Sequence, residues 1–225
     1  MLTAQLTAAL ALLLAPTAAP VADQTPATAA QAAETVSIPA FPNSTCPVMG
    51  KAISTKLYTD TKYGRIYICC KACVKDIQAD VEFAYRTAYP ETQRVENEVC
   101  PVTGRTIEPE KATRVELQGR DFRVADKAAA AIALEDAQVT LTRLANPKLV
   151  DVRNGKCPIL AEPVAKNVIG VIDGHIVRFG SQKAIEEARK DSKKALAKAL
   201  EIRAAEERER AQAAEPAPAP VPAGG

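Results

Sequence analysis

The sequence has few of the residue types that fill a large core or carry acid–base catalysis. Aromatic residues make up 4% of its 225 residues, Trp is absent, and His175 is the single histidine. Because large rings are scarce, we expect several small cores rather than one extensive core. The sequence also lacks a catalytic pair of carboxylates, a Ser-His arrangement and a phosphate-cradling glycine loop, so we do not expect an enzyme.

An excess of charge of one sign is missing as well. The chain has 29 Lys and Arg against 27 Asp and Glu, a formal net charge of +2, and its basic residues form no long run. A protein that binds nucleic acid normally concentrates basic residues to meet the phosphates. We therefore expect no nucleic-acid partner.

The apolar stretch at residues 2–19, with a leucine-rich centre, is short. A helix that spans a bilayer needs roughly 20 apolar residues, so we expect no membrane span in the mature form. The length of the stretch and the small residues after it are typical of a signal peptide, although no Lys or Arg precedes it. We predict a signal peptide at 1–22, an Ala/Pro/Thr-rich linker at 23–42, and export to the periplasm or the extracellular space. The alternative is a disordered Ala-rich leader.

Three parts of the chain begin with similar sequences, and we interpret them as internal repeats. The three openings are Cys46-Pro47-Val48-Met49-Gly50, Cys100-Pro101-Val102-Thr103-Gly104 and Cys157-Pro158-Ile159-Leu160-Ala161. Each opening is followed by a β-prone stretch, a glycine turn, a second β-prone stretch and a helical pattern. The turn glycines are Gly64, Gly119 and Gly174.

This order of elements predicts an α+β fold of three tandem small ββα modules, treble-clef-like in outline, followed by a long C-terminal helix. The modules cover residues 43–90, 97–146 and 154–191, which we call segments 1, 2 and 3. We expect a helical extension at 192–215 and a disordered Pro/Ala/Gly tail at 216–225. Units this small bury few apolar side chains, so they normally need a metal, disulfides or neighbouring units for stability.

The three segments differ where the hairpin runs into the helix. Segment 1 has Cys69-Cys70-Lys71-Ala72-Cys73, which we match with residues 124–128 and 179–183 of the other two segments. Only segment 1 can therefore assemble a cysteine cluster from its own residues. In segments 2 and 3 we expect Asp126 and Ser181 to act as helix N-caps instead.

The cysteines of segment 1 have the spacing of metal ligands. Cys70 and Cys73 stand three apart at a predicted helix start, which brings their sulfurs to one face and favours thiolates. The hairpin folds the turn at Cys46 back toward them. Adjacent strand residues point to opposite faces, so Cys69 can join Cys70 at one ion only if the strand ends between them. We therefore rank Cys46, Cys70 and Cys73 first and keep Cys69 as a further candidate.

The turn that begins at Cys46 supplies a second kind of ligand. Its first and fourth positions correspond to the two ligand positions of a zinc knuckle, and Met49 occupies the fourth. We predict one soft metal ion, Cu(I) or Zn(II), bound by Cys46, Cys69, Cys70, Cys73 and Met49. Thiolates with a thioether favour Cu(I), because structural zinc sites use four Cys or His ligands.

The motifs of segment 1 resemble those of a known group of metal-binding domains. Cys-Pro-Val-x-Gly, followed by Tyr63-Gly64-x-x-Tyr67-x-Cys69-Cys70-x-x-Cys73 before a helix, is similar to the YHS and TRASH-type modules. The resemblance covers about residues 43–85. It implies metal binding without catalysis, in heavy-metal trafficking, buffering or sensing, and a metal transporter or metal chaperone protein as partner.

Two other uses of the six cysteines remain open. An exported chain with an even number of cysteines could be a disulfide-stapled scaffold, with Cys100 and Cys157 as a natural pair. Cys70-Lys71-Ala72-Cys73 at a helix start is also the arrangement of a thiol-disulfide redox protein. The predicted hairpins differ from the βαβ context that such redox proteins have.

Overall fold

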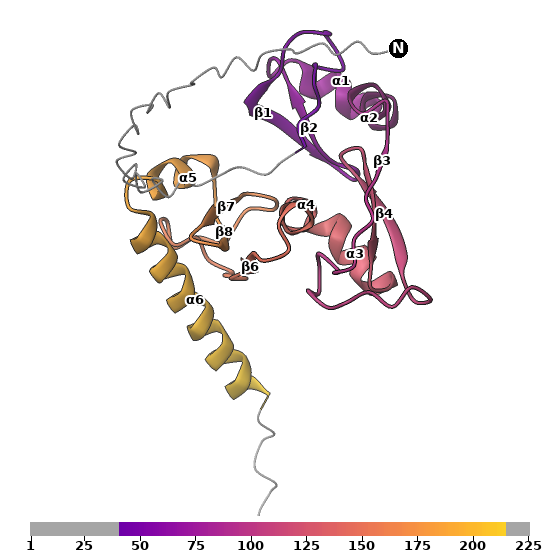
Figure 1. The fold of residues 1–225 in the computed structure, drawn as a ribbon. Helices are drawn as coiled ribbons and strands as arrows, with labels where there is room; N and C mark the ends of the chain where they lie inside the picture. The colour runs from indigo at the N-terminus through magenta and orange to yellow at the C-terminus, as the bar shows by residue number, and fades with distance from the viewer. Residues whose placement is uncertain (1–40, 215–225) are drawn as a thin grey trace, which may run out of the picture. The chain divides into compact units, whose positions relative to one another are not determined.

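The computed structural model describes residues 41–214, which form a mixed α/β structure of small sheets with a C-terminal helix (Figure 1). The predicted signal peptide at 1–22, almost all of the predicted linker at 23–42 and the predicted tail at 216–225 lie outside the described residues. Among the described helices, none combines the length and the apolar character that crossing a bilayer requires.

Each of the three segments contains an antiparallel hairpin that is followed by two helices (Figure 1). In segment 1 these elements are β1 (Ser54–Thr61), β2 (Gly64–Ile68), α1 (Cys73–Ala79) and α2 (Val81–Ala88). In segment 2 they are β4 (Thr113–Leu117), β5 (Arg120–Val124), α3 (Lys127–Glu135) and α4 (Ala137–Ala145). In segment 3 they are β7 (Ile169–Ile172), β8 (His175–Arg178) and α5 (Gln182–Ala188), and the second helix, α6 (Ser192–Ala213), follows the segment.

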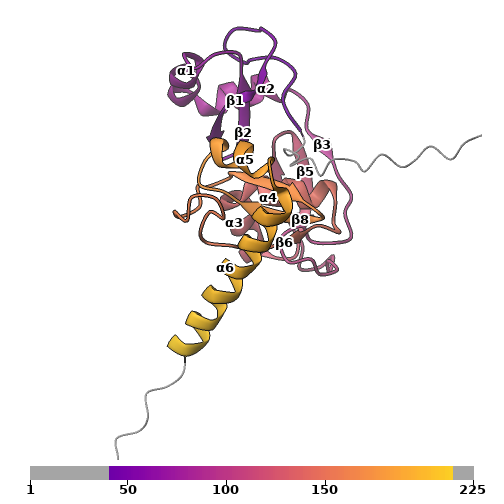
Figure 2. The same cartoon turned by 90° about the vertical axis from the view of Figure 1, so that its left-hand side faces the viewer.

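Two short strands join the later hairpins. β3 (Gln93–Arg94) lies parallel to β5, and β6 (Val150–Asp151) lies parallel to β8, so these two sheets have three strands. The predicted helical extension forms as α6, one continuous helix in Figure 2. Its first half packs on segment 3 through Ala195 and Ala199, which are buried.

The turn glycines of the three hairpins have the backbone conformation that the sequence predicts. The φ angles of Gly64, Gly119 and Gly174 are +95°, +69° and +71°, a region that side chains disfavour. Gly119 is also held closely, because a Cβ there would lie 3.1 Å from the ring of Tyr89. The hairpins in all three segments therefore turn at the predicted residues.

Helix starts in segments 2 and 3 are capped as predicted. The Asp126 side chain accepts a hydrogen bond from the Ala129 N–H, and the Ser181 hydroxyl accepts one from the Ala184 N–H. Each cap satisfies a backbone donor that the helix leaves unpaired.

Each segment has a small core of its own, as the scarcity of aromatic residues predicts. The buried residues of segment 1 include Cys46, Ile66, Ile68, Cys73 and Ile77. Those of segment 2 include Cys100, Leu117, Phe122, Val124 and Leu141. Those of segment 3 include Cys157, Ile172, Val177, Phe179 and Ile185. Every core contains the cysteine that opens its segment.

A buried polar junction connects the three segments. Arg65 of segment 1 has a 3% exposed residue surface and donates hydrogen bonds to Asp60 and, at 2.8 Å, to the Asn167 carbonyl of segment 3. The Arg65 N–H donates to the Gln118 side-chain oxygen of segment 2 at 3.0 Å. Gln138 donates to the same oxygen of Gln118. Arg65, Gln118, Gln138 and Asn167 are buried, so each depends on the others for its hydrogen bonds.

We predict that Gln118→Ala lowers the free energy of unfolding by about 2–4 kcal/mol, because it leaves the Arg65 N–H and the Gln138 amide without their acceptor. Urea unfolding followed by circular dichroism measures this. The control is Gln78→Ala on the exposed face of α1, which removes an amide that has no buried partner. Equal stability of the two variants would contradict the role given to the junction.

Candidate metal centre

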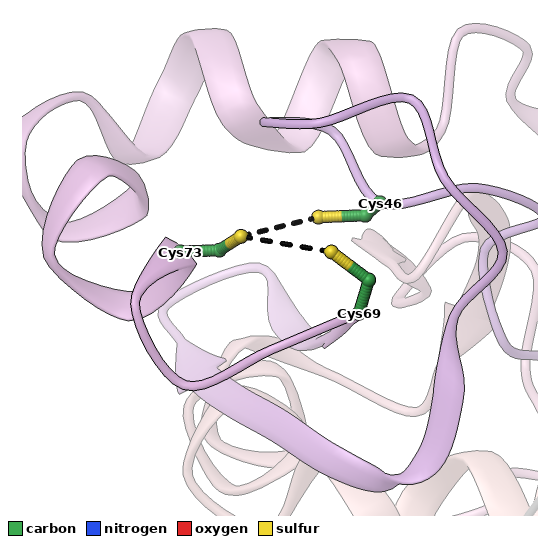
Figure 3. A group of neighbouring side chains, drawn as sticks. All are labelled: Cys46, Cys69 and Cys73. Carbon is green, nitrogen blue, oxygen red and sulfur yellow. Dashed lines mark hydrogen bonds between the residues drawn. The ribbon is translucent and has the colours of Figure 1, made fainter.

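Three cysteines of segment 1 converge in space. Cys46 comes from the turn that opens the segment, Cys69 from the residue after β2, and Cys73 from the first residue of α1 (Figure 3). The Cys73 sulfur lies 3.6 Å from that of Cys46 and 3.9 Å from that of Cys69. All three sulfurs lie within 4.8 Å of one another, so this group could hold a metal ion.

The other two predicted ligands lie at the edge of this group or outside it. The sulfur of Cys70 is 3.5 Å from that of Cys73, but Cys70 is exposed and does not belong to the three-sulfur group. Met49 is 52% exposed. The thioether that the sequence suggested as fourth ligand therefore faces solvent, and Cys70 is the additional sulfur in contact with the cluster.

In the structure Cys69, rather than Cys70, joins Cys46 and Cys73, because β2 ends and α1 begins at different residues from those that the sequence suggested. β2 ends at Ile68, before both cysteines, so strand alternation does not separate them. α1 begins at Cys73 rather than at Cys70, and the residues between form a turn. This turn brings Cys69 into the half-buried position beside Cys46 and Cys73.

The turn at Cys46 has the same hydrogen bonds as its counterparts. The Cys46 N–H donates to Lys51 O at 2.8 Å and its carbonyl accepts from the Gly50 N–H at 2.8 Å. The equivalent pairs at Cys100 and Cys157 measure between 2.7 and 2.9 Å. The residue after each turn has a positive φ, +64° at Gly50, +74° at Gly104 and +56° at Ala161.

An asparagine fixes the cysteine turn of segment 1 against β2. The Asn43 side chain donates to Thr45 O at 2.8 Å and to Tyr67 O at 2.9 Å, and it accepts from the Tyr67 N–H at 2.8 Å. Asn43 is 2% exposed, so these hydrogen bonds are shielded from water. We call this set of three hydrogen bonds the asparagine clamp.

The same clamp occurs in the other two segments, and the sequence analysis missed it. Asn97 bonds in this way to Val99 and Arg123, and Asn154 to Lys156 and Arg178. The sequence does contain a sign of the clamp, because an asparagine precedes each opening cysteine by three positions. Its role depends on a strand about 24 residues away, which spacing alone does not indicate.

Segments 2 and 3 replace the cluster with small side chains. The Ala125 N–H donates to the Cys100 sulfur at 3.3 Å. Gly180 lies against Cys157, because a Cβ atom added at Gly180 would be 3.6 Å from the Cβ of Cys157. Ala125 and Gly180 thus stand where Cys69 stands in segment 1. The match expected from the sequence is therefore shifted by one residue, and the counterparts of Cys73 are the buried residues Ala129 and Ala184.

The four thiols have different pKa values because their surroundings differ. Burial raises the pKa of the Cys46 thiol, but three backbone N–H groups outweigh it and lower that pKa to about 7; they belong to Cys69, Met49 and Val48. Burial and the neighbouring thiols raise the pKa of Cys73 to about 12. Burial also raises the pKa of Cys69, whereas the hydrogen bond with Cys73 lowers that of Cys70.

The sulfur separations suit a shared metal ion. A tetrahedral site with metal–sulfur distances of about 2.3 Å has sulfurs about 3.8 Å apart, and a trigonal site has them about 4.0 Å apart. The separations of 3.6 and 3.9 Å around Cys73 are close to both values. A bound cation would also favour the thiolate form of Cys73, whose pKa burial raises. The donor set fits a soft metal.

All six cysteines of the chain are free thiols in the structure. Cys100 and Cys157 are completely buried, and they lie in the separate cores of segments 2 and 3. The pairing of Cys100 with Cys157 that the sequence allowed is therefore absent, and each thiol packs as a small apolar side chain.

Comparison with protein-family models, with curated proteins and with solved structures gives no match for this chain.

We predict that iodoacetamide at pH 7, in limiting amount, modifies Cys70 before the other five cysteines. Cys70 is exposed and its pKa is lowered, whereas Cys46, whose pKa is also lowered, is buried. Mass spectrometry of peptides from the alkylated protein gives the order of reaction. Cys100 and Cys157 should react last because they are fully buried, and their modification at the rate of Cys70 would contradict the structure.

Proposed function

We propose that this chain is a metal-binding protein that holds one soft metal ion in segment 1. The observation that carries the proposal is the convergence of Cys46, Cys69 and Cys73, whose sulfurs lie within 4.8 Å of one another. Two of the three, Cys46 and Cys73, are buried, so bulk water and dissolved oxidants have little access to their sulfurs. Three thiolates are a ligand set that soft metal ions prefer.

The number of sulfurs distinguishes the two candidate ions. Cu(I) is stable with the three thiolates of Cys46, Cys69 and Cys73, whereas structural Zn(II) sites have four protein ligands. Cys70, at 3.5 Å from Cys73, is the residue that can supply a fourth thiolate after a small rotation. We therefore assign the inner site to Cu(I) without the exposed Met49, and make Cys70 the fourth ligand for Zn(II).

We also propose that segments 1, 2 and 3 are repeats of one ββα unit, and that segments 2 and 3 have lost its ligands. The shared turn, the asparagine clamp and the hairpin support this relation. The likeness of segment 1 to YHS and TRASH-type modules supports a treble-clef-like unit. It also supports a non-enzymatic role in heavy-metal trafficking, buffering or sensing, with a metal transporter or chaperone as partner. The apolar stretch at residues 2–19 supports export.

Replacing the inner cysteines tests the proposal. Cys46→Ser, Cys69→Ser and Cys73→Ser should each weaken metal binding by about 100-fold or more, because each removes one of three thiolates. The bound metal is measured by mass spectrometry of the elements after equilibrium dialysis of reduced protein, without oxygen, against Cu(I) or Zn(II) held by a competing chelator.

Cys100→Ala and Cys157→Ala are the matched controls, because they remove the same opening cysteine from segments that lack the rest of the cluster. Both controls should bind one metal ion per chain, as the parent does. Loss of metal from a control as large as from Cys73→Ser, with both proteins folded, would contradict a site local to segment 1.

A second pair of variants identifies the fourth ligand. Cys70→Ser removes the exposed thiol and leaves a hydroxyl, which is not among the usual protein ligands of zinc. We expect this variant to keep its Cu(I) affinity within about threefold and to lose about tenfold or more in Zn(II) affinity. Met49→Leu should change neither affinity, since Met49 is exposed. A loss of Cu(I) affinity in Met49→Leu would restore the thioether as a ligand.

Thiol-disulfide exchange is a second candidate function, favoured by the 3.5 Å contact between the sulfurs of exposed Cys70 and buried Cys73. An exchange reaction needs an attacking thiolate at the surface and a resolving thiol behind it. Reduction of insulin by a dithiol in the presence of the protein separates the two functions. Acceleration that Cys70→Ser abolishes would favour exchange over metal binding.

A further inference from the structure

The structure contains a cleft of about 690 Å³ that involves none of the six cysteines. Its walls come from the turn after Cys100, the junction of α3 and α4, the residues around β6, and α6. This volume lies in the range of roughly 300–1,000 Å³ that is usual for small-molecule sites. Metal binding by the cysteines of segment 1 does not explain this cleft.

Positive charge dominates the lining of the cleft, although the chain as a whole is almost neutral. Five lining residues are arginines and two are acidic; the arginines are Arg105, Arg153, Arg178, Arg203 and Arg210. Both acidic residues bind the same arginine, since Arg178 lies 3.1 Å from Asp136 and 2.9 Å from Asp151. Among the lining residues, the arginines therefore outnumber the carboxylates by five to two.

The remaining arginines differ in how well they are paired. Arg203 forms an ion pair with Glu207 at 2.7 Å, and Arg153 lies 3.7 Å from Asp151, which Arg178 already holds. For Arg105 and Arg210, residues 41–214 supply no acidic partner within 4.0 Å. Both are exposed, so their guanidinium groups are available to a ligand.

The lining of the cleft also has an apolar part. Val139 and Val164 line the cleft, and so does Ile132, which is 47% exposed. An aliphatic surface of this kind beside several guanidinium groups suits a molecule with an acidic group and a hydrocarbon or aromatic part.

We propose that this cleft binds a small organic anion through a carboxylate or phosphate group. Arg105, Arg153 and Arg210 hold the anionic group, because the planar guanidinium matches the paired oxygens of both acids. Ile132 and Val139 contact the apolar part of the ligand. The cleft is a second binding site, and it does not require metal at the cysteine cluster.

A fluorescent anion tests this site directly. The probe is 1-anilinonaphthalene-8-sulfonate, which has a sulfonate and an aromatic body, titrated into reduced, metal-free full-length protein. We expect saturable binding of one probe, and competition by pyrophosphate or by citrate. The more effective competitor shows whether phosphate or carboxylate is preferred. Failure of both to compete would overturn the proposal, since the probe would then occupy an apolar surface.

Matched double variants separate the cleft from the charge of the whole protein. Arg105→Gln with Arg210→Gln should weaken probe binding by about tenfold or more, because two guanidinium groups leave the site. Arg86→Gln with Arg208→Gln removes the same charge from exposed residues that do not line the cleft, and should change binding less than about twofold. Equal weakening in both pairs would overturn the proposal.

Ile132→Ser tests the apolar wall separately. This exposed position tolerates a polar side chain, so the variant should fold as the parent does, which circular dichroism checks. We expect weaker binding of the probe and an unchanged inhibition constant for pyrophosphate, which has no apolar part. Unchanged binding of both ligands would remove Ile132 from the site and contradict the amphiphilic ligand that we propose.

Discussion

The asparagine clamp is the interaction on which the cysteine cluster depends. Three hydrogen bonds between 2.8 and 2.9 Å long join Asn43 to its own turn and to Tyr67 near the end of β2, and the two to Tyr67 are buried. The turn contains Cys46, and the chain that leaves β2 contains Cys69, two residues beyond Tyr67. Holding these two backbone segments together brings the first sulfur to the other two before any metal arrives, which lowers the entropic cost of binding.

The clamp belongs to the scaffold rather than to the chemistry. Asn97 and Asn154 make the same bonds in segments 2 and 3, where alanine or glycine stands in place of the remaining sulfurs. Each segment therefore has a stable frame from its own small core, and the buried junction at Arg65 and Gln118 ties the frames together. Only segment 1 uses the frame to gather thiols.

The sequence predicted those features that depend on neighbouring residues. The hairpin glycines and the caps at Asp126 and Ser181 follow from local rules. The candidates also included the three converging cysteines, although Cys46 and Cys73 are 27 residues apart. It failed where one residue changes the outcome, because β2 ends at Ile68 and so turns Cys69 inward and Cys70 outward. Distant pairings such as the asparagine clamp also escaped, since they arise only when the chain folds back.

X-ray absorption at the metal edge, on protein purified anaerobically with its metal, tests the central claim most directly. The account predicts three sulfur neighbours at about 2.3 Å for Cu(I), or four for Zn(II). The spectrum of Cys100→Ala should be the same as that of the parent. A first shell made of nitrogen and oxygen, or metal-free protein with Cys73 in a disulfide, would contradict a thiolate site at Cys46, Cys69 and Cys73.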